Sequence, residues 1–113
     1  MATRDEIVEF LRCAHAAQPP NVINTAKNRE TRFRLGITID DQKRIIGNLV
    51  ADDYLKGPEP DRDQTFPGDV WIFKRVEFNT TFYIKLKLII RGDNTNLALI
   101  AISCHIDNLD AGI

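Results

Sequence analysis

The sequence predicts one small α+β domain of two layers, with N-terminal helices packed on a mainly antiparallel sheet. In the first half of the chain, apolar residues recur every three to four positions, which is typical of helices; from Val70 onward they alternate, which is typical of strands. Helices gathered on one side of an antiparallel sheet give this fold class. With 113 residues and 43% hydrophobic composition, the chain can bury one modest core, so we expect residues 1–113 to form a single domain.

Three helices are predicted in the first half. The first begins at the capping box of residues 3–6 (TRDE) and stops before Pro19. A short extended stretch, NVINTA, follows, and KNRETRFRLG then favours two helical turns that end at Gly36. The third helix begins at residues 38–41 (TIDD) and continues through an amphipathic segment.

Three consecutive antiparallel strands are predicted in the second half: VWIFKRVEF, FYIKLKLII and LALIAISCHI. Asn79-Thr80 and the segment RGDNTN separate them, and both are acceptable hairpin connections. In the middle strand, one face carries Phe82, Ile84, Leu86 and Leu88, and the other carries Tyr83, Lys85 and Lys87. We therefore expect one face to form the core and the other to carry chemistry or contact water.

Composition and motifs exclude several classes of protein. Lys and Arg total 15 against 16 Asp and Glu, so no global field suggests a protein that coats nucleic acid or anionic membrane. Cys13 and Cys104 lack CxxC spacing and only two histidines accompany them, so no structural zinc site is expected. No metal or cofactor is predicted for the site. The N-terminus MATRDEIVEF does not fit a signal peptide, and no apolar run is long enough to span a membrane, which predicts a cytoplasmic protein. Hydrolase motifs such as HExxH are also absent from the sequence.

A small set of polar residues near the strands is left as the candidate site. Its members are Lys56, Arg62, Arg75, Tyr83, Lys85 and His105. Taken singly, each is explained equally well as a surface side chain. Together they suit RNA cleavage by the 2′-hydroxyl of the substrate, which requires a base, an acid and positive charge on the phosphate. The hairpin supports this interpretation, because five cationic residues stand there against one carboxylate: Lys74, Arg75, Lys85, Lys87 and Arg91 against Glu77.

Several segments resemble the MqsR-type toxins of bacterial type II toxin-antitoxin systems, which are mRNA interferases with a RelE-like fold. The matching segments are DDYLKGPEPDRD, GDVWIF, FYIKLKL and AISCHID, within roughly residues 35–107. The resemblance implies a metal-independent endoribonuclease that acts on mRNA and is silenced by an antitoxin encoded nearby. It assigns catalytic roles to Lys56, Tyr83 and His105.

The chain departs from this family in two respects. Some members carry a glutamine beside the strand tryptophan, whereas Ile72 stands there in this sequence, so the role of the glutamine passes to Arg75 or Arg62. Members are often basic, whereas this chain has a net charge of −1.

The proline-rich segment YLKGPEPDRDQTFPGDVWIF is expected to be a loop that holds Lys56 and Arg62 over the sheet face bearing Tyr83. Two other classes of function use the same face. One is a non-catalytic module whose sheet receives a partner strand. The other is a regulator that binds nucleic acid through the basic hairpin, although no basic recognition helix is evident.

Overall fold

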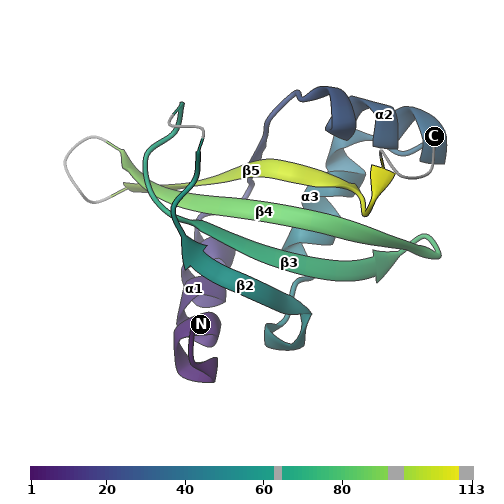
Figure 1. Ribbon diagram of the computed structural model, residues 1–113. Helices are drawn as coiled ribbons and strands as arrows, with labels where there is room; N and C mark the ends of the chain where they lie inside the picture. The colour runs from purple at the N-terminus through teal and green to yellow at the C-terminus, as the bar shows by residue number, and fades with distance from the viewer. Residues whose placement is uncertain (63–64, 92–95, 110–113) are drawn as a thin grey trace.

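The computed structural model describes residues 1–62, 65–91 and 96–109, and these form the α+β domain that the sequence predicts. The described residues form three helices and a five-stranded sheet in the order β1-β5-β4-β3-β2, and Figure 1 shows how the helices and the sheet are arranged. The helices are α1 (Arg4–Ala16), α2 (Ala26–Leu35) and α3 (Ile39–Gly47), followed by the 3-10 turn η1 (Ala51–Asp53). The strands are β1 (Asn21–Val22), β2 (Tyr54–Glu59), β3 (Val70–Glu77), β4 (Thr80–Arg91) and β5 (Asn96–Ile106).

The predicted helix boundaries are confirmed by their caps. The Thr3 side chain accepts a hydrogen bond from the backbone of Glu6 and completes a capping box for α1. Thr38 and Asp41 form the same arrangement for α3. The second helix is capped by Gly36, as predicted, and the φ of 65° at this residue lies in the left-handed region that glycine adopts without strain. None of the helices among the described residues is long and apolar enough to cross a membrane.

The prediction of three strands was incomplete, because two further strands complete the sheet. The short strand β1 pairs in parallel with β5, and β2 pairs antiparallel with β3 at the opposite edge. The β2 segment was expected to be a loop because it contains Gly57 and Pro58. A proline is tolerated on an edge strand, where no further strand needs its missing N–H. The left-handed Gly57 (φ 116°) also lets the two strands approach, since a Cβ there would stand 2.6 Å from the carbonyl oxygen of Val70.

The hairpin between β3 and β4 lies one residue earlier than predicted. Glu77 pairs with Thr80, so Phe78 and Asn79 form the two-residue turn, and both have positive φ angles, 52° and 55°. This conformation matches the turn type that suits the twist of a hairpin. The second predicted connection falls mostly on residues 92–95, which lie outside the described residues.

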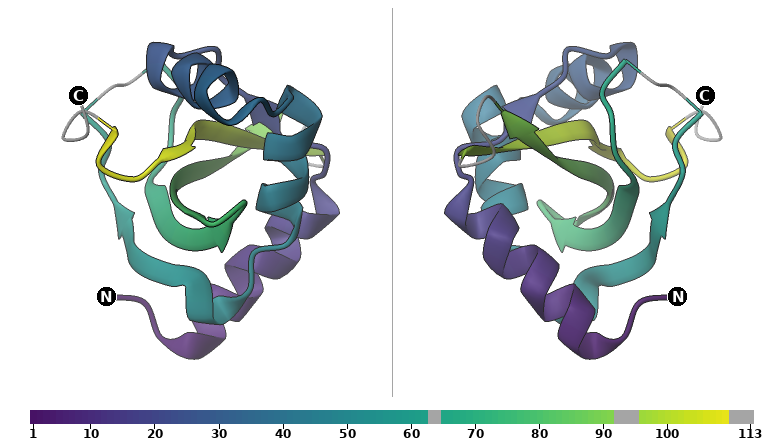
Figure 2. Two further views of the ribbon diagram at one scale, coloured as in Figure 1. Left: turned by 90° about the vertical axis from the view of Figure 1, so that its right-hand side faces the viewer. Right: turned by 90° about the vertical axis from the view of Figure 1, so that its left-hand side faces the viewer.

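The core lies between the sheet and helices α1 and α3, which sit behind the sheet in Figure 1 and on one side of it in Figure 2. Phe82, Ile84 and Leu86 of β4 are fully buried there, as the alternation of this strand predicts. We call the opposite side, which carries Tyr83 and Lys85, the outer face. It is partly covered by the segment between β2 and β3.

Helix α2 is attached to the sheet by polar groups and not by an apolar stripe. The fully buried side chain of Asn28 donates to the carbonyl of Ile102 at 3.2 Å and accepts from the backbone N–H of Cys104 at 2.9 Å. Thr31 accepts from the N–H of Ile106, also at 2.9 Å. The short strand β1 pairs with β5 only at residues 100 and 101. Side chains of α2 therefore supply the hydrogen-bond partners for backbone groups of the β5 residues that follow. These bonds place the N-terminus of α2 beside the end of β5.

Candidate active site

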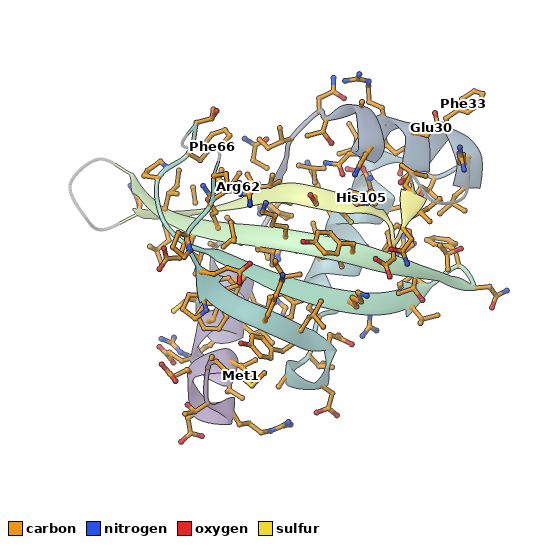
Figure 3. All side chains as sticks on the ribbon, viewed as in Figure 1. Met1, Glu30, Phe33, Arg62, Phe66 and His105 are labelled. Atoms are coloured by element: carbon orange, nitrogen blue, oxygen red, sulfur yellow. The ribbon has the colours of Figure 1, made fainter. Side chains whose placement is uncertain are left out.

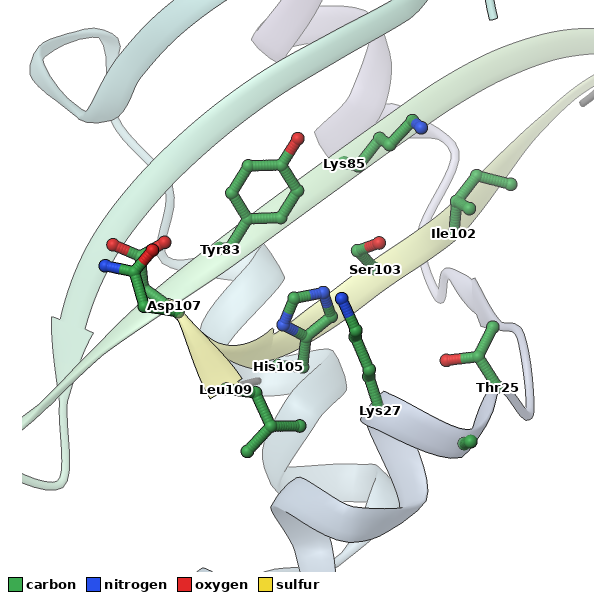
Figure 4. A pocket seen from close by; sticks show the side chains of 11 residues that line it. Thr25, Lys27, Tyr83, Lys85, Ile102, Ser103, His105, Asp107 and Leu109 are labelled. Atoms are coloured by element: carbon green, nitrogen blue, oxygen red, sulfur yellow. The ribbon is translucent and has the colours of Figure 1, made fainter. Parts of the chain in front are cut away.

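An open hollow of about 630 Å³ lies on the outer face, between the N-terminus of α2 and the ends of β4 and β5 (Figure 4). Three groups of residues line it: Thr25, Ala26 and Lys27 from α2 and its cap; Tyr83 and Lys85 from β4; and Ile102, Ser103, His105, Asp107, Asn108 and Leu109 from β5 and the segment after it. Three of the six candidates from the sequence therefore meet here: Tyr83, Lys85 and His105.

Tyr83 and His105 form the centre of the hollow. They are direct cross-strand partners of β4 and β5, and their rings stack with centroids 5.4 Å apart and planes inclined by 21°. The His105 residue is only 8% exposed, so its ring is held in position by its surroundings. This packing orients the imidazole, and it results from the register between the strands.

The backbone determines which tautomer of His105 is present when the ring is neutral. Its Nδ1 lies 2.9 Å from the carbonyl oxygen of Ile106. A carbonyl oxygen only accepts hydrogen bonds, so Nδ1 carries the proton and Nε2 carries the lone pair. The neutral ring is therefore prepared as a base at Nε2, and the protonated ring as an acid at the same atom.

Lys27 is a residue of the hollow that the sequence reasoning missed. It lies in the first turn of α2, after the N-cap Thr25, and Figure 4 shows its side chain directed toward the ring of His105. The predicted second helix contained this lysine, but the position of the helix depends on hydrogen bonds that Asn28 and Thr31 make to β5 residues more than 70 positions away. Only the fold brings this cation to the hollow.

The segment between β2 and β3 is tied to the outer face by Asp61. Its carboxylate pairs with Lys85 at 3.3 Å and with Lys87 at 3.0 Å, and Lys87 also donates to the carbonyl of Phe66. The side chain of Lys87 is 0% exposed, so this lysine is buried beneath the segment and does not face solvent. Burial by itself raises the pKa of Asp61, but hydrogen bonds from Lys87 and then Lys85 outweigh it, and the pKa lies below the ordinary value of 3.8.

The basic patch expected on the hairpin is largely neutralised by acids from other parts of the chain. In addition to the two ion pairs of Asp61, a further ion pair joins Lys74 to Asp107 at 3.0 Å. Arg75 lies opposite Phe82, on the helix-covered side of the sheet and away from the hollow. It pairs with Glu77 and then Asp53, which together raise its pKa above the ordinary value. The side chain of Arg91 lies outside the described part of the structure. The count of charges along the hairpin did not include Asp53, Asp61 and Asp107. These residues lie outside the hairpin in the sequence and contact it only in the folded structure.

Neither Lys56 nor Arg62 lines the hollow. Lys56 lies on the edge strand β2 opposite Ile72, two strands from Lys85, and its ammonium is 3.6 Å from Glu59. It is therefore on a strand and not on a loop above the tyrosine, as had been expected. The exposed Arg62 follows Asp61 on the segment that crosses the outer face (Figure 3).

Two further classes of site find little support in the residues that the structure describes. Burial raises the pKa of the Cys104 thiol to about 12, so this thiol stays protonated at neutral pH and is a poor nucleophile. No group of three or more His, Cys, Asp or Glu side chains within the described ranges is placed to hold a metal ion. The side chains in the hollow are suited instead to proton transfer and to contact with an anion.

Comparisons of the chain with known protein families, curated proteins and solved structures found no match. The resemblance to MqsR-type toxins therefore stays a prediction, and the assignment of a function depends on the chemistry of the hollow.

Proposed function

We propose that this protein is a metal-independent endoribonuclease that cleaves mRNA in the hollow on its outer face, as the toxin of a type II toxin-antitoxin system. The proposal is carried by the stacked pair of Tyr83 and His105, with Lys27 directed toward the imidazole and Lys85 lining the same hollow. A histidine oriented at Nε2 supplies proton transfer, and the two lysines supply positive charge for a phosphate.

In the reaction, the 2′-hydroxyl oxygen of the substrate attacks the adjacent phosphorus and its proton passes to water. The new bond joins the 2′-oxygen to phosphorus, and the bond from phosphorus to the 5′-oxygen breaks. Protonated His105 donates its Nε2 proton to the leaving 5′-oxygen. Lys27 stabilises the charge on the pentacoordinate phosphate, a role that the sequence had led us to expect of Lys56, and Tyr83 orients the histidine. The products then carry 2′,3′-cyclic phosphate and 5′-hydroxyl ends.

A free ribonuclease that cleaves cellular mRNA is harmful to its host, which argues for an inhibitory antitoxin encoded nearby. An interface of standard size, about 1,600 Å² in total, is sufficient for nanomolar affinity. Expression of the wild-type gene without its neighbours should therefore arrest growth, and co-expression of the adjacent reading frame should relieve the arrest. Normal growth under a strong promoter would argue against the toxin assignment.

The direct test is incubation of the purified protein with a defined single-stranded RNA in EDTA, followed by mapping of both new ends. We expect cleavage that resists EDTA and yields the cyclic phosphate and the 5′-hydroxyl. Activity that disappears in EDTA and returns with Mg²⁺, or products with 5′-phosphate ends, would contradict the mechanism. A preparation of the His105→Ala variant, purified in the same way, controls for contaminating ribonucleases.

A further inference from the structure

Two lysine–carboxylate pairs flank the ring stack at the centre of the hollow. Lys74, on β3, lies directly opposite Tyr83 of β4 and pairs with Asp107 at 3.0 Å. Lys85 lies two residues along β4 from Tyr83 and pairs with Asp61 at 3.3 Å. Figure 4 shows Asp107 and Lys85 toward opposite ends of the hollow. Each side of the candidate reaction centre therefore carries a cation that a carboxylate already holds.

The two carboxylates are held in different ways. The side chain of Asp61 is 6% exposed and also neutralises the fully buried Lys87, so it anchors a segment of the chain. The side chain of Asp107 is 17% exposed, and its partner Lys74 is 41% exposed, so this pair can open without exposing a buried charge. The two pairs therefore allow the effect of the carboxylate on binding to be separated from its effect on folding.

We propose that Lys74 and Lys85 bind the phosphates on either side of the scissile phosphate, and that Asp107 and Asp61 occupy these lysines until RNA displaces them. This inference rests on the proposed function. Carboxylate and phosphodiester oxygens both accept charge-assisted hydrogen bonds from an ammonium group, so one anion can replace the other. Lys74 and Lys85 are diagonal neighbours on adjacent antiparallel strands, where positions are about 7–8 Å apart, and their long side chains can spread apart to reach the two phosphates that flank the scissile one. The substrate is then a single strand with at least three consecutive phosphates.

The exchange predicts a particular dependence on salt. In the wild type, the carboxylate that RNA displaces from its lysine binds a cation from solution. This uptake offsets the cation that the phosphate releases when it binds the lysine. When the carboxylate is removed, this offset disappears, and each freed lysine should steepen the slope of log Kd against log salt by about 0.7 for a single strand. Binding at low salt should become tighter in the same variants.

The experiment measures binding of a 2′-O-methyl RNA oligonucleotide, which lacks the attacking hydroxyl and cannot be cleaved, at several salt concentrations. Asp107→Asn and Asp61→Asn should each give the steeper slope. Asp52→Asn is the matched control, because Asp52 pairs with Arg4 at an exposed site outside the hollow, and its slope should equal that of the wild type. Thermal melting of each variant reports its folding, and Asp107→Asn, which leaves no buried lysine behind, keeps the test valid if Asp61→Asn is unstable.

Three results would overturn the inference, and they separate it from the proposed function. If the wild type binds and cleaves RNA but Asp107→Asn keeps the wild-type slope, the lysines do not exchange partners and the proposed function still stands. If the melting temperature falls without any change in slope, the pairs are structural only. If the wild type does not bind the oligonucleotide and does not cleave RNA, both proposals fail.

Discussion

The ring of Tyr83 stacks on the ring of His105 across the ladder between β4 and β5, with centroids 5.4 Å apart. This contact and the bond from Nδ1 of His105 to the carbonyl of Ile106 orient the imidazole from two sides. The only other histidine of the chain, His15, lies on α1, which packs against the opposite side of the sheet. His15 is therefore an internal control for the role proposed for His105.

His105→Ala should lower the rate of RNA cleavage by about 10²–10⁴-fold, the usual contribution of a general acid or base. His15→Ala should leave the rate close to that of the wild type, since its ring contacts the carbonyl of Leu49 and does not line the hollow. Single-turnover cleavage of a defined RNA measures both variants, and circular dichroism checks their folding. Equal rates for the two variants would exclude His105 from the chemistry.

Lys27→Met should lower the cleavage rate by about 10²–10³-fold, because it removes one electrostatic contact with the developing charge. Lys56→Met should cleave at nearly the wild-type rate, since Lys56 lies on the edge strand and pairs with Glu59. Lys43→Met, on α3, controls for the loss of a positive charge. The same cleavage assay decides between the lysines: a large loss in Lys56→Met with none in Lys27→Met would restore the role that the family resemblance assigns to Lys56.

Gly57→Ala should lower the free energy of unfolding by about 1–3 kcal/mol, because the residue has a left-handed φ and its new methyl group meets the backbone of β3. Gly47→Ala, at the end of α3, has no atom within 4 Å of the new methyl group and should be neutral or more stable by up to about 1 kcal/mol. Urea denaturation of the two variants measures the difference. Similar stabilities would show that β2 does not require the close approach at Gly57.

Asn28→Ala should destabilise the fold by about 1–3 kcal/mol for each buried backbone group left without its partner. Those groups include the carbonyl of Ile102 and the N–H of Cys104. Asn24→Ala, at an exposed residue, should stay within about 0.5 kcal/mol of the wild type. Denaturation curves compare the two asparagines. An Asn28→Ala variant as stable as Asn24→Ala would mean that α2 is held to the sheet by other contacts.

The stability of the protein should depend on pH through Asp61. Its pKa lies below the ordinary value of 3.8, so the folded state favours the charged carboxylate. This contribution is fully present above pH 3.8 and is lost as the pH falls through the lower pKa of the folded state. In denaturation series from pH 7 down to pH 2, the wild type should therefore lose more stability than Asp61→Asn. Parallel pH profiles for the two proteins would show that Asp61 does not contribute in this way.

Local sequence patterns were enough to predict the helices, their caps and the alternation of the central strand. Caps such as Thr3 with Glu6 involve residues three positions apart, and alternation follows from the backbone of one strand. The sequence also indicated that Tyr83, Lys85 and His105 share a region, because all three lie on adjacent strands of a predicted meander. These features depend on short stretches of chain, so they can be read without knowing the fold.

The residues that line the hollow, and the charge around it, could not be predicted in this way, because they depend on contacts between distant parts of the chain. Lys27 reaches the hollow because Asn28 bonds to β5, and Lys87 is buried because Asp61 returns across the outer face. The edge strand β2, which carries Lys56, forms because β3 supplies its partners. Each of these contacts joins residues distant in the sequence, and its free energy depends on burial and pairing that no local pattern contains.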